Sequence, residues 1–428
     1  MITAAVMLWG RRIGAVTWSA TANLASFEYD PEFRSSGIEV SPIVMPLDAR
    51  IHQFPGLPRE AFKGLPGMLA DSLPDRYGHA LIDAWLARQG RQPASFSPVE
   101  RLCYVGTRGM GALEYHPARG PGASADDLDV ARLVELADAV LAERASLNAN
   151  VERDEKAIDQ VLQVGTSAGG VRAKAIIAWN PETQAVRSGQ GGLDPGFAHW
   201  ILKLDGVRST DEREVGTGRG YGLVEYAYHR MALRAGLTMN ECRLLEEGGR
   251  HHFMTRRFDR TESGKKIHMQ SLAALGHYDF NAAGSYSYEQ TVEIMRRLDL
   301  SQREIEQQFR RTAFNVIGRN QDDHVKNTAF LMDRSGRWSL CPAFDVTYSY
   351  NPAGRWTNEH QMSVGGKRDG FVVDDLVAFG RFCNLKAAQA RRILGEVLEA
   401  VGTWKEIADE AGVSPKTADE VARHHRRF

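Results

Sequence analysis

The chain has 428 residues, of which 43% are hydrophobic and 25% charged, the composition of an ordinary soluble globular protein. At about 150 residues per domain the length allows roughly two or three domains, which excludes a peptide or a disulfide-stabilised miniprotein. Lys and Arg number 53 against 54 Asp and Glu, so the net charge is −1. We therefore expect no overall attraction to nucleic acid or anionic lipid, and contact with either would need a local patch.

The cysteines and the N-terminus indicate a reducing compartment. Cys103, Cys242, Cys341 and Cys383 show no CxxC spacing, so neither a zinc site nor a disulfide framework is expected. The opening MITAAVMLWGRRIGAV places its arginines after a short apolar run, the reverse of the order in a signal peptide. No apolar run approaches the ~18 residues that cross a bilayer. We expect a cytoplasmic protein without a membrane partner.

The first part of the chain predicts a small β domain followed by a linker. Residues 4–50 alternate short apolar runs with turn residues, which favours an antiparallel sheet, and residues 54–117 are rich in loops. The segment PARGPGASADD at 117–127 combines Pro, Gly and Ser before an Asp pair, typical of a linker that ends in a helix cap. From Leu128 onward, apolar residues recur at helical spacing.

The rest of the chain changes from β-like to helical patterns. A glycine-rich turn occurs in VGTSAGGVRAKAIIAW at 164–179, where Gly165–Lys174 lies between two strand-like segments. HWILKLDG at 199–206 is a further strand-like run that predicts a buried strand. A helix is expected from about Val224, and FMTRRFDR at 253–260 is β-like. Helical patterns then continue nearly to the end, interrupted by NQDDHVKN and the strand pair TAFLMD and RWSLCPAFD. This order fits a two-lobed enzyme with its site in the cleft, although a plain α+β chain would show it too.

The first candidate for chemistry is the glycine-rich segment from Gly165 to Lys174. Small residues allow backbone N–H groups to approach a phosphate closely, because no Cβ intervenes. The segment is not a Walker A loop, since Val171 occupies the position of the lysine, and it is not GxGxxG. Glycine content alone leaves two interpretations open, a tight hairpin and a phosphate-binding loop.

The second candidate is Lys203, which interrupts an apolar run. An ammonium group that is buried needs a carboxylate or a phosphate as its partner, and Glu225 at the start of the next helix is a candidate. The alternative is a half-exposed strand from which Lys203 faces water.

The polar cluster at 320–327 carries the most specific signal. Asp322 is followed five residues later by Asn327, and Asp345 comes 18 positions after that, beyond the predicted strand pair. This is the polar set of a kinase catalytic loop and its metal site, and its oxygen ligands suit Mg²⁺. Residue types alone leave open whether Asp322 or Asp323 is the base. They also leave open a polar turn with an Asp as helix cap.

Other signals are weaker. His251–His252 and His424–His425 lack the spacing of a zinc site, and Ser167 lies in no GxSxG motif. The C-terminal segment 406–428 has the rhythm of a helix-turn-helix, but we expect a helical hairpin with a solvated basic tail.

Taken together, these motifs resemble the HipA family of toxin–antitoxin serine/threonine kinases over essentially the full length. The similar segments are GRRIGAV, FEYDPEF, GLPGMLADSLPDRYG, YVGTRGMGALEY, SAGGVRAKA, HWILKL, RRFDR, DDHVKN and PAFDVTYS. The resemblance implies an α+β, protein-kinase-like two-lobed fold. It divides the chain into a β-rich N-terminal subdomain (1–120), an N-lobe with the glycine loop and ATP lysine (126–262) and an all-helical C-lobe (263–428).

The resemblance also implies ATP and Mg²⁺ as cofactors and assigns residues to them. Asp322, two positions before His324, matches the catalytic aspartate, and Asn327 and Asp345 match the metal ligands. The residues that match the ATP site are Gly169, Gly170, Val171, Arg172, Ala173, Lys174, Lys203, Arg256, Arg257, Phe258, His324, Val325, Lys326, Asn327, Phe344 and Asp345.

The resemblance also covers Ser167, and the sequence differs from the family's usual residues at two places. Ser167 aligns with the family's autophosphorylated serine, and a phosphate of about −2 charge there would repel the phosphates of ATP and eject the loop. Where the family often has Gly-Val-Gln-Pro-Lys this chain has Gly-Val-Arg-Ala-Lys, and Arg256 replaces a commoner acidic residue. The resemblance therefore implies no contacts with ATP from the side chains of Arg172, Ala173 or Arg256.

The implied function is that of a toxin kinase. Its expected target is an aminoacyl-tRNA synthetase, and its expected partner is a HipB-like helix-turn-helix antitoxin that brings the complex to operator DNA. Three alternatives remain at this point: an inactive HipA-like scaffold, a regulator that binds DNA through its basic C-terminus, and a small-molecule kinase of related fold.

Overall fold

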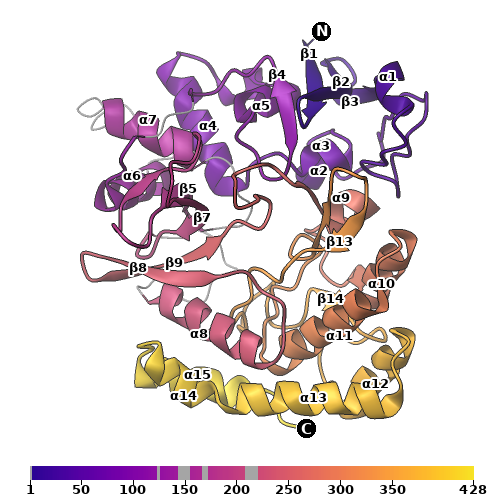
Figure 1. Ribbon diagram of the computed structural model, residues 1–428, viewed down its shortest axis with the longest axis vertical. Coiled ribbons are helices and arrows are strands. Elements are labelled where there is room, and N and C mark those ends of the chain that lie inside the picture. Colours follow the sequence, from indigo (N-terminus) through magenta and orange to yellow (C-terminus); the bar gives the residue numbers. More distant parts are fainter. Residues whose placement is uncertain (1, 123–125, 143–154, 166–171, 208–219) are drawn as a thin grey trace.

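The computed structural model describes residues 2–122, 126–142, 155–165, 172–207 and 220–428. Three units surround a central cavity: an N-terminal unit (2–122), a sheet unit (126–256) and a C-terminal unit (257–428). Figure 1 shows the N-terminal unit at one end of the long axis and the C-terminal helices at the other. The α+β class is confirmed, whereas the predicted domain boundaries stay a prediction.

The N-terminal unit contains the predicted antiparallel sheet. Its strands are β1 (Ile2–Leu8), β2 (Arg11–Ser19), β3 (Leu24–Tyr29) and β4 (Leu113–His116), in the order β3-β2-β1-β4. Buried and less buried residues alternate along β1, as expected for a sheet with one face on the core. The short helices are α1 (Pro31–Arg34), α2 (Arg59–Phe62), α3 (Gly67–Ala70), α4 (Arg76–Arg88), η1 (Pro93–Ser95) and α5 (Pro98–Val105).

The sheet unit is a five-stranded antiparallel sheet with helices on both sides. Its strands, β5 (Lys174–Trp179), β6 (Val186–Ser188), β7 (Ala198–Lys203), β8 (Cys242–Glu247) and β9 (Arg250–Arg256), have the order β6-β5-β7-β9-β8. Helices α6 (Val130–Ala142) and α7 (Glu155–Val164) lie near β5, and α8 (Tyr221–Arg234) packs against β8 and β9. All six residues of β5 are buried, consistent with a covered central strand.

One prediction about this unit was wrong. The residues before the glycine-rich segment form the helix α7 instead of a strand, because Val161, Leu162 and Val164 reach the core formed with Tyr77 and Leu81 at helical spacing. The glycine positions 166–171 themselves lie outside the described residues, and with them Ser167, Gly169, Gly170 and Val171.

The C-terminal unit is mainly helical, as predicted. Its helices are α9 (Leu272–Gly276), α10 (Tyr288–Arg297), α11 (Gln302–Ile317), α12 (Val373–Phe382), α13 (Ala387–Gly402), α14 (Trp404–Glu410) and α15 (Pro415–His424). The part expected to be all-helical also holds two small sheets. Their strands are β10 (His268–Ser271), β12 (Ala329–Met332) and β13 (Trp338–Leu340) in one, and β11 (Tyr286–Ser287) and β14 (Met362–Ser363) in the other. The predicted strand pair is the antiparallel β12–β13.

The C-terminal segment corrects a second prediction. Helices α14 and α15 form the expected hairpin, but the basic tail after them is only partly solvated, with Arg427 exposed and Arg426 buried. The side chain of Arg426 is 8% exposed and donates hydrogen bonds to Asp369 and to the carbonyl of Val316. Arg426 is buried because this segment folds back onto the end of α11, where the Arg426 N–H donates to Ile317 O over 3.0 Å.

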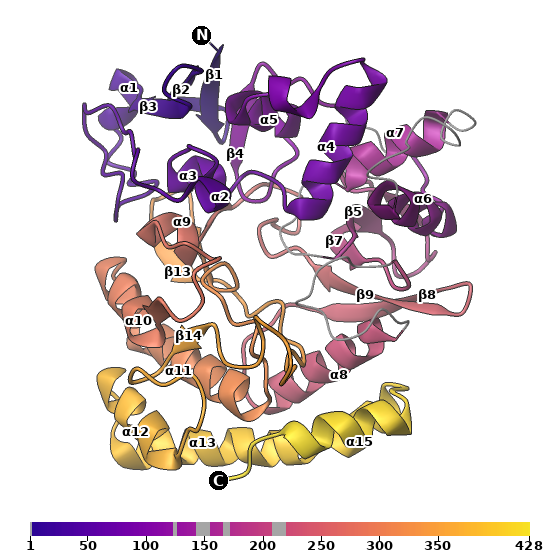
Figure 2. The same ribbon diagram turned by 180° about the vertical axis from the view of Figure 1, so that it is seen from behind.

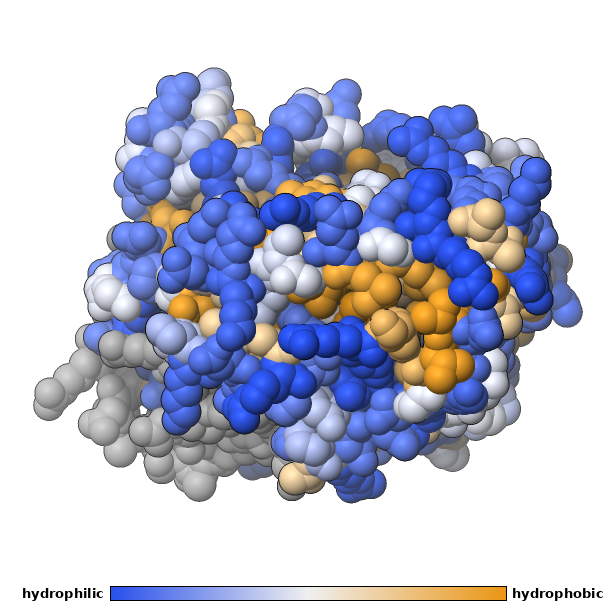
Figure 3. Space-filling view, turned by 90° about the horizontal axis from the view of Figure 1, so that it is seen from below, coloured by the Kyte–Doolittle hydropathy of each residue, from blue (hydrophilic) through white to orange (hydrophobic). Residues whose placement is uncertain are grey.

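The outer face of the C-terminal helices is largely hydrophilic, with one apolar area over the helices (Figure 3). Within the described ranges, no helix is long and apolar enough to cross a membrane. The four cysteines are all buried free thiols, as expected.

The N-terminal and C-terminal units share one hydrophobic core. A single cluster extends from Val6 and Phe27 of the first sheet to Phe314 of α11 and Trp404 of α14, whereas the strands of the sheet unit pack with α4, α6 and α7 in a second cluster. Helix α3 lies beside α9 (Figure 2), so closely that a Cβ on Gly67 would be 2.5 Å from Ala274 O. The two units are therefore fixed against each other.

A buried charge cluster adds to this attachment. The Asp259 carboxylate is fully buried and accepts hydrogen bonds from Arg257 Nε at 2.8 Å and Arg260 Nη1 at 2.8 Å. It also accepts the N–H of Gly111, at 2.6 Å, while Arg257 Nη2 donates to Gly109 O at 3.3 Å. The loop of the N-terminal unit is thus joined to the segment that follows β9.

Replacement of Asp259 by Asn should destabilise the protein by about 3–5 kcal/mol, because two buried guanidinium groups lose their carboxylate. Burial alone would raise the pKa of Asp259, but Arg257 and Arg260 hold it well below its ordinary value. The carboxylate therefore stabilises the fold above pH ~4, and the difference between wild type and variant should shrink in acid.

Urea unfolding at pH 7.5 and at lower pH measures this difference. Asp194→Asn is the control, because Asp194 pairs with Arg187 on the surface and its loss should cost less than ~1 kcal/mol. A similarly small loss for Asp259→Asn would contradict the assignment.

Candidate active site

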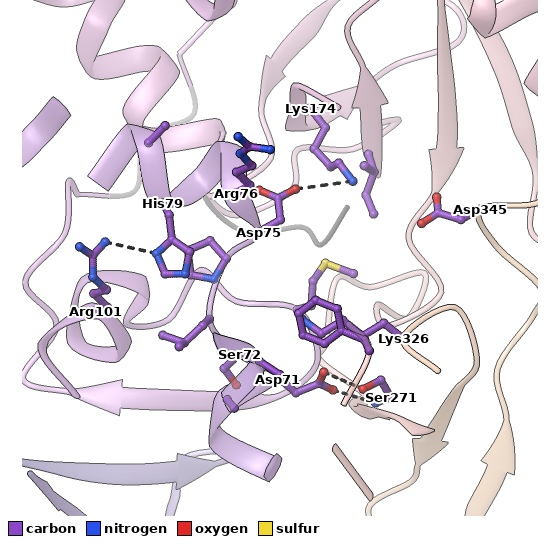
Figure 4. A pocket seen from close by; sticks show the side chains of 18 of the residues that line it. Asp71, Ser72, Asp75, Arg76, His79, Arg101, Lys174, Ser271, Lys326 and Asp345 are labelled. Carbon is purple, nitrogen blue, oxygen red and sulfur yellow. Dashed lines mark hydrogen bonds and ion pairs between the residues drawn. The ribbon is translucent and has the colours of Figure 1, made fainter. Parts of the chain in front are cut away.

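The candidate site is a cavity of about 1160 Å³ lined by all three units. This exceeds the ~300–1,000 Å³ typical of small-molecule pockets. It brings together ten of the residues predicted for the nucleotide and metal. They are Lys174, Lys203, Arg256, Arg257, Phe258, His324, Lys326, Asn327, Phe344 and Asp345. Figure 4 shows part of this lining, with Lys174, Lys326 and Asp345 around the same space.

Four of the other predicted residues have different positions. Ala173 and Val325 are buried in hydrophobic clusters, so their side chains do not line the cavity. The guanidinium of Arg172 lies 4.1 Å from the centre of the Tyr221 ring. Asp322 lies beside the lining, with Oδ1 4.0 Å from His324 Nε2.

Lys203 is the central cation of the site. Strand β7 lies between β5 and β9 and carries Lys203 at its last position. Its Nζ is 2.5 Å from Glu225 Oε1 of α8 and 2.6 Å from Asp345 Oδ1. Burial opposes the charge on Lys203, but Asp345 and Glu225 outweigh it and raise the pKa of the ammonium group above its ordinary value. The buried interpretation and the partner Glu225 are therefore confirmed, and the water-facing alternative is excluded.

Asp345 joins the C-terminal unit to this cation. It follows β13 and has a φ of 51°, a left-handed conformation that is uncommon outside glycine. Burial would raise the pKa of Asp345, but Lys203 and Lys174 lower it to about 2, so the carboxylate is ionised at neutral pH. The preceding Phe344 packs its ring against Phe258, with centroids 5.5 Å apart, and both line the cavity.

The two aspartates of the polar cluster have opposite environments. Asp323 is buried, and its carboxylate accepts hydrogen bonds from His360 Nδ1 at 2.7 Å, Tyr288 OH at 2.6 Å and Gln361 N at 2.7 Å. The side chain of Asp322 is 29% exposed. Of the two, only Asp322 has a partly exposed carboxylate, which supports it over Asp323 as the base; the catalytic role itself stays a prediction.

Asn327 and Asp345 offer oxygen atoms to a cation. Asn327 Nδ2 donates to Asp322 O at 2.8 Å, which leaves the amide oxygen as the group that can meet a metal ion. Among the residues that the structure describes, no three His, Cys, Asp or Glu side chains form a metal-binding group. A pair of protein oxygens fits Mg²⁺ that arrives with a nucleotide, because Mg²⁺ is typically held by one or two carboxylates together with phosphates and water.

The N-terminal unit contributes residues that the sequence did not predict. Asp75 caps α4, with Oδ1 accepting Gly78 N at 2.8 Å, and its Oδ2 lies 3.9 Å from Lys174 Nζ (Figure 4). Asp71 accepts hydrogen bonds from Ser271 N and Oγ, both at 2.7 Å. A Pro-Asp pair ahead of a helical pattern is a signal for a helix cap, but nothing in it indicates a contact with Lys174.

The environment of Asp75 is unfavourable for a charge. The side chain is 8% exposed, and Oδ2 is buried without a hydrogen-bond partner. Burial raises the pKa of Asp75 to about 6, an effect that Lys174 only partly offsets. A carboxyl group that lies in a cleft although burial disfavours its charged form is typical of functional sites.

Replacement of Asp75 by Asn should stabilise the fold at pH 7.5 by about 1–3 kcal/mol, because Asn still caps the helix and removes a carboxylate whose pKa burial raises to about 6. The ionised carboxylate lowers the stability of the wild type as pH rises from the ordinary pKa of Asp, near 4, toward 6. The stability advantage of Asp75→Asn should therefore vanish near pH 4. Thermal unfolding at both pH values measures it.

Asp30→Asn is the matched control, since Asp30 caps α1 with a side chain that is 22% exposed, and it should change stability by less than ~0.5 kcal/mol. Equal stability of wild type and Asp75→Asn at pH 7.5 would contradict the interpretation.

Comparisons with known proteins agree with this architecture. The model of the HipA N-terminal domain matches residues 4–116, and that of the HipA-like C-terminal domain matches residues 166–421. No curated protein matches the sequence. A solved structure, that of the Shewanella oneidensis MR-1 toxin–antitoxin system HipA, HipB and its operator DNA complex, has a TM-score of 0.66 at 16% identity. The match covers 98% of this chain and 94% of that chain, and it shows the fold. Because the two models together span most of its length, the chain belongs to the HipA family.

Proposed function

We propose that the chain is the toxin of a type II toxin–antitoxin system and an ATP- and Mg²⁺-dependent serine/threonine protein kinase. The observation that carries the proposal is Lys203, bonded to Glu225 and Asp345 in the cavity that Asn327 also lines. In protein kinases a lysine paired with a helix glutamate and an aspartate that holds Mg²⁺ must both be in place for transfer. The antiparallel sheet above a helical unit is the arrangement that such a two-lobed enzyme needs.

Lys203 would bind the phosphates of ATP. An ammonium group has three N–H donors, and Glu225 and Asp345 take two of them, so the third is free to meet a phosphate oxygen. Lys174 and Lys326 line the same cavity and add positive charge. Asn327 and Asp345 would hold Mg²⁺, which neutralises phosphate charge during transfer. Together these groups stabilise the charge of the transferring phosphoryl group.

The adenine would lie where the sheet unit joins the C-terminal unit. The side chains of Arg256 and Arg257 are engaged by Glu262 and Asp259, so they do not offer adenine contacts. Three backbone groups there are also occupied. Arg256 N bonds to Glu241 O, Arg256 O to Asn240 Nδ2, and Arg257 N to His199 O. We therefore assign adenine recognition to the Arg257 carbonyl and the Phe258 amide, with the Phe258 and Phe344 rings against the base.

Asp322 would orient the substrate hydroxyl and accept its proton. Its main-chain carbonyl is tied to Asn327 Nδ2, so the proposed base and one proposed metal ligand are held at a fixed separation. Such positioning supplies much of the rate enhancement in phosphoryl transfer.

The finer parts of the proposal rest on family membership. The protein substrate would be an aminoacyl-tRNA synthetase, whose modification halts translation and growth, and phosphorylation of Ser167 would switch the kinase off. The partner would be a HipB-like antitoxin in the cytoplasm, through which the chain reaches operator DNA, as in the similar solved complex of HipA, HipB and operator DNA.

Incorporation of γ-labelled phosphate tests the kinase activity. Asp322→Asn should lower transfer by at least about 100-fold, because the base is lost, while calorimetric ATP affinity stays within about threefold of wild type. Asp333→Asn, on the exposed β12–β13 turn, is the control and should leave labelling unchanged. Equal labelling by wild type and Asp322→Asn would contradict the role of Asp322.

Electrophoretic mobility shifts test the partner. The full chain should bind operator DNA only together with a small helix-turn-helix protein, because its net charge of −1 gives no general attraction to DNA. DNA binding by the chain alone, with a steep dependence on salt, would instead favour a direct regulator.

A further inference from the structure

The candidate base Asp322 lies between two buried neighbours, Gln321 and Asp323. Asp323 is held by the side chains of His360 and Tyr288, and Gln321 by Arg319 and the carbonyl of Thr357. Two hydrogen-bonded routes lead away from them, and both routes end at Arg426, two residues before the end of the chain.

The first route runs through His360. Arg426 Nη1 lies 2.9 Å from His360 Nε2, and His360 Nδ1 lies 2.7 Å from Asp323 Oδ2. A guanidinium group can only donate, so Nε2 must be the acceptor and the proton of a neutral His360 is on Nδ1. Arg426 therefore selects the tautomer in which His360 donates to Asp323. All three side chains are nearly or fully buried.

The second route runs through Asp369. Arg426 Nη2 donates to Asp369 Oδ1, the same oxygen that accepts Arg319 Nη1 at 3.3 Å. Arg319 Nη1 also donates to Gln321 Oε1 at 2.9 Å. Both sides of Asp322 are thus connected to one guanidinium group.

The tail that carries Arg426 is itself anchored. His424 Nδ1 lies 2.6 Å from Tyr348 OH, and His425 Nε2 lies 2.8 Å from Tyr228 OH. The carbonyl of His424 accepts Arg319 Nε at 2.9 Å. With the bond between Arg426 N and Ile317 O, these contacts fix the tail on the loop that leads from α11 to the polar cluster.

We infer that Arg426 is a positioning residue for the proposed phosphoryl transfer: it orients the loop that carries Asp322, through His360 and Asp323 on one side and Asp369 and Arg319 on the other. This inference rests on the proposed function. Among the described residues, the partners of Arg426 are Val316, Ile317, His360, Asp369 and Phe371, none of which is assigned to ATP or Mg²⁺, so we expect it to act on the reaction through the loop.

Arg426→Gln in the full chain tests the inference, with Arg427→Gln as the matched control because Arg427 is the exposed neighbour of the same type. For Arg426→Gln we expect kcat to fall about 10- to 100-fold, with ATP affinity within about twofold of wild type, because a small displacement of a catalytic group has effects of this size. Arg427→Gln should match wild type. Rates are compared well below the melting temperature of each variant, so that unfolding does not contribute.

The tautomer argument gives a sharper test. In His360→Asn the amide nitrogen takes the place of Nδ1 and still donates to Asp323, but the acceptor for Arg426 is gone. Adding Arg426→Gln to His360→Asn should therefore reduce kcat less than it does in wild type, because one route is already broken. If Arg426 and His360 acted independently, the fold reductions in kcat of the two single variants would instead multiply in the double variant.

Hydrogen exchange separates failure of this inference from failure of the proposed function. In Arg426→Gln the amides of residues 320–327 should exchange faster than in Arg427→Gln, while those of β5 should not change. This result is expected even if the wild type transfers no phosphate, an outcome that would overturn the proposed function alone. Unchanged exchange in that loop, or a kcat for Arg426→Gln within twofold of wild type, would overturn the positioning role.

Discussion

The site depends on the ion-paired ammonium group of Lys203. An ammonium group cannot be kept away from water without compensating charge, and here Glu225 of α8 and Asp345 of the C-terminal unit supply it. Breaking either ion pair would leave a buried charge without its partner, so the two pairs hold together the three segments that carry these residues. Strand β7, helix α8 and the loop after β13 meet at Lys203, and the cavity forms where they meet.

The N-terminal unit is part of the same construction. It shares the main hydrophobic core with the C-terminal unit, and Asp259 joins its loop at Gly109 and Gly111 to the segment after β9. This attachment places Asp75 in the cavity, opposite Lys174. A unit without any of the predicted nucleotide motifs therefore forms one wall of the site, and it places there a buried carboxyl group whose pKa burial raises, as is typical of functional sites.

Much of the fold follows from local patterns. Alternation in residues 4–50 predicted the first sheet, and the apolar run around Lys203 and the segments around Phe330 and Trp338 predicted strands that are present. The errors occurred where a distant partner decides the outcome. The segment before the glycine-rich loop is helical because its apolar face meets α4, and residues 424–426 of the basic tail are held on the protein because Tyr228, Tyr348 and Asp369 bond to them.

The sequence by itself determined the chemical inventory: a lysine in an apolar strand, a glycine-rich segment, and the Asp, Asn and Asp of the polar cluster in an order that resembles one family. It determined these because residue type and spacing are local properties. Only the tertiary structure decided which groups meet. Burial and three hydrogen bonds engage Asp323, which favours Asp322 as the proposed base. Long-range contacts bring Asp75 to the cavity and Arg426 to the loop that carries Asp322. Such pairings depend on how distant segments pack, and no local pattern carries that information.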